Sequence, residues 1–243
     1  MAFKTFPMRL LESRNITPSI LHLAFTRDDG EAFEYKAGQF INIHFECDGK
    51  LIHRSYSIAN TPGDDYVEIA MSPVENGRAT KLLSGLSVGD VIQVSGPYGR
   101  FVLKDDEPTR YVLVATGTGV TPYRAMLPSL EERIARGFTV DVLLGIWRRE
   151  EALYADDFRA FADKQPGFTF HACYSRELPD DATDHEFKGY VQARMQQLDL
   201  NPERDIVYLC GNPDMVDQAL AWLKELGFPI SHVRREKYLS ARS

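Results

Sequence analysis

A glycine-rich turn between a predicted buried strand and a helix is the clearest chemical feature of the sequence. Residues 111–115 are apolar or small and predict a fully buried strand, and residues 116–119 read Thr-Gly-Thr-Gly. Thr121 and Pro122 then open a helix, with the Thr121 hydroxyl as the expected cap. Backbone N–H groups at such a turn can hold a phosphate. A tight turn of any α/β unit remains an alternative, because the spacing is not GxGxxG.

A second candidate site lies in the first hundred residues. In the run Arg54-Ser55-Tyr56-Ser57, strand alternation places Arg54 and Tyr56 on one face and Ser57 on the other. An ordinary edge strand that binds no ligand could have the same residue pattern. Residues 77–80, Gly-Arg-Ala-Thr, open a short helix that suits an anion. Two helix N-termini could therefore each bind an anion, one in this segment and one after the strand 111–115. They predict two separate phosphorylated ligands.

A third cluster follows the third strand of the predicted parallel sheet. Ser175 and Arg176 place a hydroxyl and a guanidinium at the carboxyl edge of that sheet, where a nucleotide is expected. Arg148 and Arg149 follow the second strand. They either contact a phosphate or pair with the acidic residues at 150 and 151 in a solvated turn.

The elements that position these residues fall into two groups. Short strands at 40–45, 66–71 and 91–94, with a helix at 78–83, indicate an antiparallel barrel or sandwich. The charged segment 104–110 is the best boundary. Beyond it, strands at 111–115, 140–145, 169–174, 206–209 and near 232–233 alternate with helices at 122–136, 156–164, 191–198 and 215–226. This alternation predicts a parallel sheet covered by helices, and we expect domains at 1–105 and 106–243.

Composition narrows the function classes. The chain has 243 residues and a net charge of −7, which argues against nucleic acid as a partner. Cys47, Cys173 and Cys210 fit neither zinc nor iron–sulfur spacing, and the six histidines show no metal spacing, so we expect no metal site. We find no signal sequence and no apolar run of membrane-spanning length. We therefore expect a cytoplasmic protein with no membrane partner.

Four motifs in order resemble those of the ferredoxin–NADP reductase family. Arg54-Ser55-Tyr56-Ser57 resembles its RxYS flavin motif, and residues 96–99 (Gly-Pro-Tyr-Gly) resemble its GPxG turn. Residues 117–122 are similar to its GTGxxP loop, and residues 210–216 resemble its CGxPxMV segment. The set spans nearly the whole chain.

The resemblance implies a two-domain β + α/β protein, in which an antiparallel FAD-binding β-barrel is followed by a parallel-sheet NADP-binding α/β domain. FAD would lie between the domains, with Arg54 near its phosphates, Tyr56 against the isoalloxazine and Ser57 near N5. Cys210 would lie by the nicotinamide ring. Residues 175–177 (Ser-Arg-Glu) and 188–192 (Lys-Gly-Tyr-Val-Gln) together resemble the SRE…KxYxQ arrangement of NADP-specific reductases. The resemblance implies that Arg176, Ser175 and Lys188 bind the 2′-phosphate region and that Tyr190 stacks on adenine.

The resemblance also implies which residues form the catalytic, FAD-binding and NADP-binding sites. Catalytic roles would fall to Ser57, Cys210 and Glu236. FAD would be bound by Arg54, Ser55, Tyr56, Ser57, Ala70, Met71, Gly77, Arg78, Ala79, Thr80, Thr118 and Tyr238. NADP would be bound by Thr116, Gly117, Gly119, Thr121, Pro122, Arg148, Ser175, Arg176, Lys188, Tyr190, Gln192, Gly211, Pro213 and Met215. Glu236-Lys237-Tyr238 resembles the ExY ending of plant-type reductases, but five residues follow the tyrosine, and either they are a plain tail or they anchor Tyr238 over the flavin.

The implied function is transfer of a hydride between NADPH and FAD, and of single electrons between FAD and a separate ferredoxin or flavodoxin. Two alternatives stay open within enzymes: a NAD(P)H–flavin reductase and the reductase component of an oxygenase. Outside enzymes, a nucleotide-sensing flavoprotein subunit is the alternative. We expect a monomer.

Overall fold

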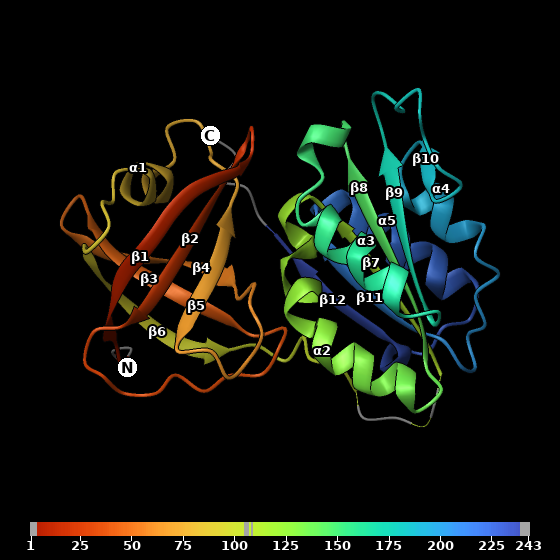
Figure 1. Cartoon of the computed structure of the whole chain (residues 1–243), viewed down its shortest axis with the longest axis horizontal. Coiled ribbons are helices and arrows are strands. Elements are labelled where there is room, and N and C mark those ends of the chain that lie inside the picture. Colours follow the sequence, from red (N-terminus) through yellow and green to blue (C-terminus); the bar gives the residue numbers. More distant parts are fainter. Residues whose placement is uncertain (1–3, 105–106, 108, 239–243) are drawn as a thin grey trace. The chain divides into compact units, whose positions relative to one another are not determined.

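The computed structural model describes residues 4–104, 107 and 109–238, which form two compact units. Among these residues, one unit contains 4–103 and 121–126, and the other contains 104, 107, 109–120 and 127–238. Figure 1 shows the elements of both units. In the described ranges, no helix is both long and apolar enough to cross a membrane.

The first unit is an antiparallel barrel. Its strands are β1 (Phe6–Thr17), β2 (Ile20–Arg27), β3 (Phe40–Cys47), β4 (Lys50–Ser57), β5 (Tyr66–Met71) and β6 (Val91–Tyr98), and its helix is α1 (Arg78–Ser84). The sheet order is β4-β3-β6-β1-β2-β5. An antiparallel bridge between Ile58 and Ile69 joins the two ends of this sheet. The predicted antiparallel barrel is therefore confirmed.

Strands β1 and β2 lie outside the ranges that the sequence predicted. β1 alternates at first, with Met8 and Leu10 fully buried and Arg9 exposed between them. Its pairing with β2 then shifts register between Leu10 and Glu12. Such a bulge breaks the period of two on which strand prediction depends.

The second unit is a parallel sheet covered by helices, as predicted. Its strands are β7 (Arg110–Thr116), β8 (Thr139–Ile146), β9 (Phe168–Tyr174), β10 (Glu186–Lys188), β11 (Ile206–Gly211) and β12 (Val233–Lys237). Its helices are α2 (Thr121–Ala135), which begins in the first unit, α3 (Ala155–Lys164), α4 (Val191–Gln196) and α5 (Pro213–Glu225), with short 3-10 segments η1 (Gly117–Val120), η2 (Arg149–Glu151) and η3 (Ile230–His232). Strand β10 was not predicted, because three residues carry no periodicity.

The order of the parallel strands places the site. The sheet runs β10-β9-β8-β7-β11-β12, so the chain moves outward in one direction from β7 and then crosses to β11 on its other side. Sheets of this kind bind ligands at the carboxyl ends of their strands, where the direction changes. A ligand is therefore expected at the turns after β7 and β11.

Both faces of this sheet are buried. Helices α4 and α5 pack on one face, through Val191, Met195 and Val216, onto Val112 and Val114 of β7. On the other face, Phe158 of α3 stacks on Phe170 of β9.

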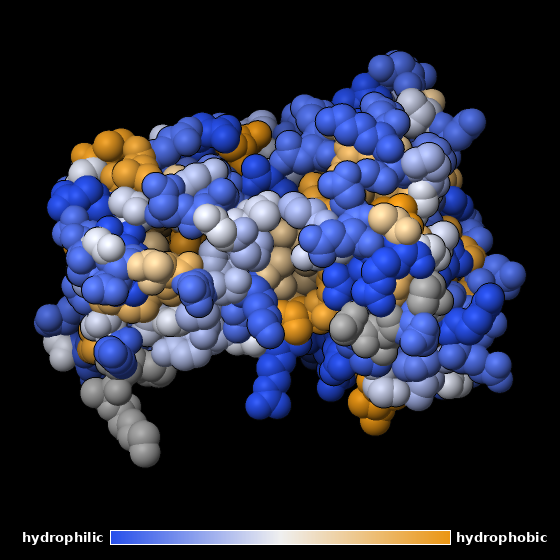
Figure 2. Space-filling model, turned by 60° about the horizontal axis from the view of Figure 1, so that its bottom comes forward, coloured by the Kyte–Doolittle hydropathy of each residue, from blue (hydrophilic) through white to orange (hydrophobic). Residues whose placement is uncertain are grey.

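The outer surface is mainly hydrophilic on the face that Figure 2 shows, with small separate hydrophobic patches.

Candidate functional site

The turns after β7 and β11 interlock. The backbone N–H of Asn212 donates to the Thr116 hydroxyl at 2.9 Å. A Cβ on Gly119 would lie 2.3 Å from the Cys210 carbonyl oxygen, and a Cβ on Gly211 would lie 2.5 Å from the Thr116 hydroxyl oxygen. Both glycines are therefore required by close packing of the two turns.

Gly117 differs from these two glycines. It has a φ of +53°, and a Cβ placed on it would meet no heavy atom within 4 Å. The side of the loop on which this Cβ would lie is therefore open. That arrangement fits the approach of a nucleotide phosphate.

The start of α2 differs from the prediction. The helix is preceded by η1, and Val120 enters it with helical angles (φ −76°, ψ −16°) and no side-chain cap. The expected cap by Thr121 is therefore wrong. Its hydroxyl is buried and has no hydrogen-bond partner within the described ranges. Because a 3-10 turn leads into the helix, no extended capping residue precedes it.

Helix α5 has the side-chain cap that α2 lacks. The Asn212 side chain accepts hydrogen bonds from the N–H groups of Asp214 (2.9 Å) and Met215 (3.2 Å), and Pro213 is the first helical residue. The helix begins two residues before the predicted start. The signal was present in the sequence as Asn-Pro. Met215 is buried in the core between α5 and the sheet.

Cys210, Glu236 and Tyr238 gather beside these turns. Burial raises the pKa of the Cys210 thiol well above its usual value; the neighbouring Glu236 adds to this, and a hydrogen bond with Tyr238 opposes it. The thiol is therefore protonated at neutral pH. Burial also raises the pKa of Glu236 to about 7, and its Oε2 is buried without a hydrogen-bond partner in the described part of the chain.

Tyr238 is the last described residue. Its backbone N–H donates to the Gly211 carbonyl at 2.8 Å, which continues the contact of β12 with β11. The predicted alternatives for the tail, residues 239–243, lie outside the described residues.

The cluster at the end of β9 is held by its neighbours. The Ser175 hydroxyl donates to the Ile146 carbonyl at 3.1 Å, and Lys188 Nζ donates to the Arg176 carbonyl. The Arg176 guanidinium lies 4.3 Å from the centre of the Trp147 ring. Tyr190, just beyond β10, is 71% exposed. The strand order brings Ser175, Arg176, Lys188 and Tyr190 to one edge of the sheet.

The arginines after β8 have carboxylate partners. Arg148 lies 3.5 Å from Glu177 and 4.0 Å from Glu150. Arg149 pairs instead with Asp181 at 2.7 Å and Glu186 at 3.3 Å. Of the two alternatives, the pairing with Glu150 is present for Arg148, whereas Arg149 has partners that the sequence did not indicate.

Gln192, another predicted NADP residue, lies on α4. Its side-chain N–H donates to Gln218 of α5 at 2.8 Å. This hydrogen bond links the two helices that cover one face of the sheet.

The predicted flavin residues of the first unit lie at the end of β4. Tyr56 is half-buried against the barrel core, and burial raises its pKa to about 12, with Arg54 opposing. Arg54 is exposed and donates to the His53 carbonyl at 2.8 Å, and Ser57 is buried. The Ser55 hydroxyl donates to the Asn42 side-chain oxygen at 2.6 Å. Ala70 and Met71 are buried at the end of β5, whereas Thr118 and Tyr238 belong to the second unit.

The segment 77–80 forms the start of α1. A Cβ on Gly77 would lie 2.9 Å from the Thr80 hydroxyl, which accepts a hydrogen bond from the N–H of Val74 at 2.9 Å. Arg78 pairs with Asp48 in the β3–β4 turn at 2.7 Å. The side chain of Ala79 adds no polar group. Thus Arg78 and Thr80 already have protein partners.

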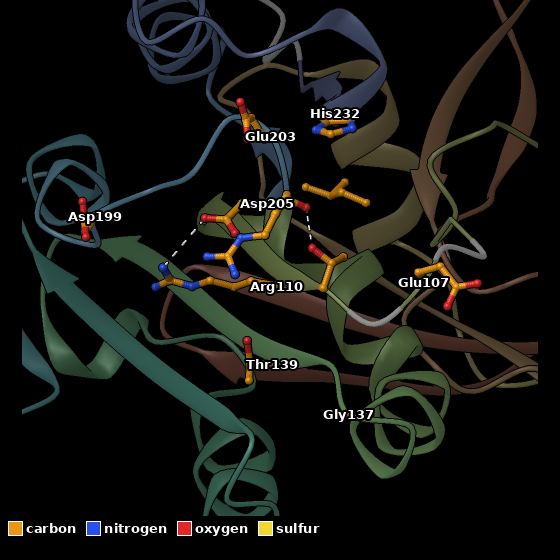
Figure 3. A pocket seen from close by; sticks show the side chains of 11 residues that line it. Glu107, Arg110, Gly137, Thr139, Asp199, Glu203, Asp205 and His232 are labelled. Carbon is orange, nitrogen blue, oxygen red and sulfur yellow. Dashed lines mark hydrogen bonds and ion pairs between the residues drawn. The ribbon is translucent and has the colours of Figure 1, made fainter.

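A cavity of about 620 Å³ lies at the opposite, amino-terminal edge of the parallel sheet (Figure 3). Arg110, Thr139 and Asp205 line it, and Arg110 lies 3.9 Å from Asp205. The Thr109 hydroxyl donates to the Arg204 carbonyl. The charged residues Arg110 and Asp205 of the cavity are thus paired with each other within the protein. None of the predicted site residues lines this cavity.

Comparison with known proteins identifies the class. Residues 7–103 match the oxidoreductase FAD-binding domain, and residues 113–220 match the oxidoreductase NAD-binding domain. The protein is therefore an oxidoreductase with an FAD-binding and a NAD(P)-binding domain. The chain is 33% identical to ferredoxin–NADP reductase B of Sorangium cellulosum (strain So ce56), over 96% of this chain and 97% of that protein. It belongs to the ferredoxin–NADP reductase family, and the predicted resemblance is confirmed.

Two further proteins show the breadth of this family. The reductase component of propane 2-monooxygenase from Rhodococcus jostii (strain RHA1) is 30% identical over 96% of this chain, which spans only 63% of that relative. The solved structure of the Amycolatopsis cytochrome P450 reductase GcoB is 26% identical, with a TM-score of 0.85, and the match covers 99% of this chain and 71% of that one.

Proposed function

We propose that this protein is an FAD-dependent NADPH oxidoreductase that exchanges electrons with a separate ferredoxin or flavodoxin. The observation that carries the proposal is the exposed Arg176 guanidinium at the carboxyl edge of the sheet, beside Ser175 and Lys188. A guanidinium in this position suits the 2′-phosphate that distinguishes NADPH from NADH. The relative that matches over nearly its whole length is named as a ferredoxin–NADP reductase.

Arg54, Tyr56 and Ser57 are the residues proposed to hold FAD. When bound, FAD supplies the chemistry that no side chain has, which is acceptance of a hydride and release of single electrons. Because burial raises the pKa of Tyr56 to about 12, its phenol stays neutral and presents an aromatic wall. Arg54 supplies an exposed cation for the phosphates.

Cys210 and Glu236 are the residues proposed to border the nicotinamide. A buried, protonated thiol is small and apolar, so Cys210 would shape the site and exclude water rather than attack a substrate. The Glu236 carboxyl has a pKa of about 7. It can therefore hold or release a proton at Oε2 near neutral pH.

One assay separates the carriers. The FAD-loaded protein would be supplied with NADPH and, in turn, with ferredoxin, flavodoxin and free FMN. The proposal expects the highest kcat/KM with one of the two protein carriers. A higher value with free FMN would identify a flavin reductase instead.

An oxygenase reductase component is the second candidate, and the matches to monooxygenase reductases favour it. Failure of both carriers, together with electron transfer to an oxygenase component, would support this candidate. Anaerobic mixing with NADPH tests enzyme against sensor, because a sensor need not bleach its flavin.

A further inference from the structure

Trp147 is an exposed aromatic residue at the carboxyl edge of the parallel sheet. It directly follows β8, and 57% of its surface is exposed. Arg176 follows β9, which lies between β8 and β10, and Tyr190 follows β10. Two exposed aromatic residues therefore flank the strand end that carries Arg176.

The contact between Trp147 and Arg176 involves both side chain and backbone. The guanidinium carbon lies 4.3 Å from the centre of the indole ring, within the range of a cation–π interaction. The N–H groups of Arg176 (3.2 Å) and Glu177 (3.4 Å) both donate to the Trp147 carbonyl. Lys188 donates to the Arg176 carbonyl. The backbone of Arg176 is thus fixed next to the ring.

The Arg176 guanidinium differs from its neighbours in what it contacts. Arg148 and Arg149 each pair with carboxylates. Within the described residues, the Arg176 side chain makes no hydrogen bond or ion pair. The indole is uncharged, so stacking orients the guanidinium without neutralising it. Because the ring covers one face of the guanidinium, the N–H donors at its edge stay free for an anion.

We propose that Trp147 is a specificity-determining residue that positions Arg176 to bind the 2′-phosphate of NADPH. The inference rests on the proposed NADPH function. It adds that the preference for NADPH depends on an aromatic support as well as on the cation. Removal of the ring should leave Arg176 charged but free to adopt many rotamers, and the phosphate would then bind at an entropic cost.

The test compares adenosine 2′-monophosphate with adenosine 5′-monophosphate by calorimetry on the FAD-loaded protein. Trp147→Leu should weaken binding of the 2′-monophosphate about two- to fivefold, the range expected for an exposed cation–π contact. Binding of the 5′-monophosphate should not change. Trp147→Phe, which retains a ring, should restore most of the affinity. In turnover, the KM for NADPH should rise by the same factor in Trp147→Leu, while kcat and the KM for NADH stay constant.

A fluorescence titration gives an independent readout. Trp222, on α5, is the second of two tryptophans, so Trp222→Phe leaves Trp147 as the only indole. In this variant the 2′-monophosphate should change the indole emission and saturate, and Arg176→Ala should remove the change. Thermal unfolding of each variant would exclude a general loss of structure.

Two outcomes would overturn the inference, and they are distinguishable. If Arg176→Ala weakens the 2′-monophosphate but Trp147→Leu does not, Trp147 has no positioning role and the NADPH proposal stands. If Arg176→Ala leaves binding of the 2′-monophosphate unchanged, the NADPH proposal fails, and this inference fails with it.

Discussion

Cys210 and Glu236 are register partners on the neighbouring parallel strands β11 and β12. The acidic side chain raises the pKa of the thiol beyond the effect of burial, and Glu236 itself has a pKa raised by burial. The pairing of β11 with the edge strand β12 thus places a protonated thiol and a carboxyl of raised pKa next to the turn after β11.

We expect Glu236 to make stability depend on pH. Burial raises its pKa to about 7 from the ordinary value of 4.5, so the folded state binds more protons than the unfolded state between these values. Stability from this group is fully present below about pH 4.5 and is lost as the pH rises through about 7. Glu236→Gln should remove the loss, with a gain relative to the native protein on the order of 2 kcal/mol at pH 8.

The measurement is urea unfolding of both proteins at pH 5 and pH 8. Glu225→Gln, at an exposed position at the end of α5, serves as the matched control and should show no such difference. Equal stability differences at the two pH values for Glu236→Gln would show that its carboxyl is not destabilised by ionisation.

Arg176→Ala should weaken NADPH selectively. Charge-assisted hydrogen bonds contribute about 1.5–3 kcal/mol, so the KM for NADPH should rise about ten- to a hundredfold. The KM for NADH should stay within about twofold, because NADH has no 2′-phosphate. Steady-state kinetics with both nucleotides give the result, and an equal loss with both would mean that Arg176 does not read the phosphate.

The two glycines of the loop after β7 should each lose stability on substitution by alanine, but for different physical reasons. Gly119→Ala places a Cβ 2.3 Å from the Cys210 carbonyl, so the turns after β7 and β11 must move apart, at a cost of about 1–3 kcal/mol. Gly117→Ala meets no neighbouring atom but adopts a φ of +53°, at a cost of about 1–2 kcal/mol.

Nucleotide kinetics separate the two variants further. The new methyl of Gly117→Ala projects into the open side of the loop, so the KM for both nucleotides should rise. Normal Michaelis constants in Gly117→Ala would contradict the phosphate site proposed there.

Glu186 should be the main support of the segment that follows β9. Its carboxylate accepts hydrogen bonds from Tyr174 (2.5 Å), the N–H of Thr183 (3.1 Å) and Arg159 (3.3 Å), and its side chain is 6% exposed. Glu186→Gln should cost about 1–3 kcal/mol, because it removes the charge to which these donors bind.

Asp181→Asn is the control for that variant. Asp181 also pairs with Arg149, but its side chain is 77% exposed. The pair is screened by solvent, so the variant should cost less than about 1 kcal/mol. Urea unfolding measures both variants. Equal costs would mean that burial of Glu186 contributes nothing to the strength of its contacts.

The sequence alone predicted the elements whose signals are local. Residues 111–115 are fully buried in β7, as their continuous apolar character indicated, because a central parallel strand is covered on both faces. Strand β5 has the predicted bounds. The family also followed from the sequence, because its four motifs are short runs in a fixed order.

Only the tertiary structure decided how the turns and strand ends contact one another. The contact of Gly119 with the Cys210 carbonyl joins residues that are far apart in the chain, and no local pattern encodes it. The same holds for Arg176 on the Trp147 ring and for Arg149 with Glu186. Strand pairing sets the contacts of Gly119 and Arg176, because neighbouring strands of a parallel sheet bring their carboxyl ends together whatever the length of chain between them. Arg149, which follows β8, instead pairs with the first residue of β10, a strand that β9 separates from β8.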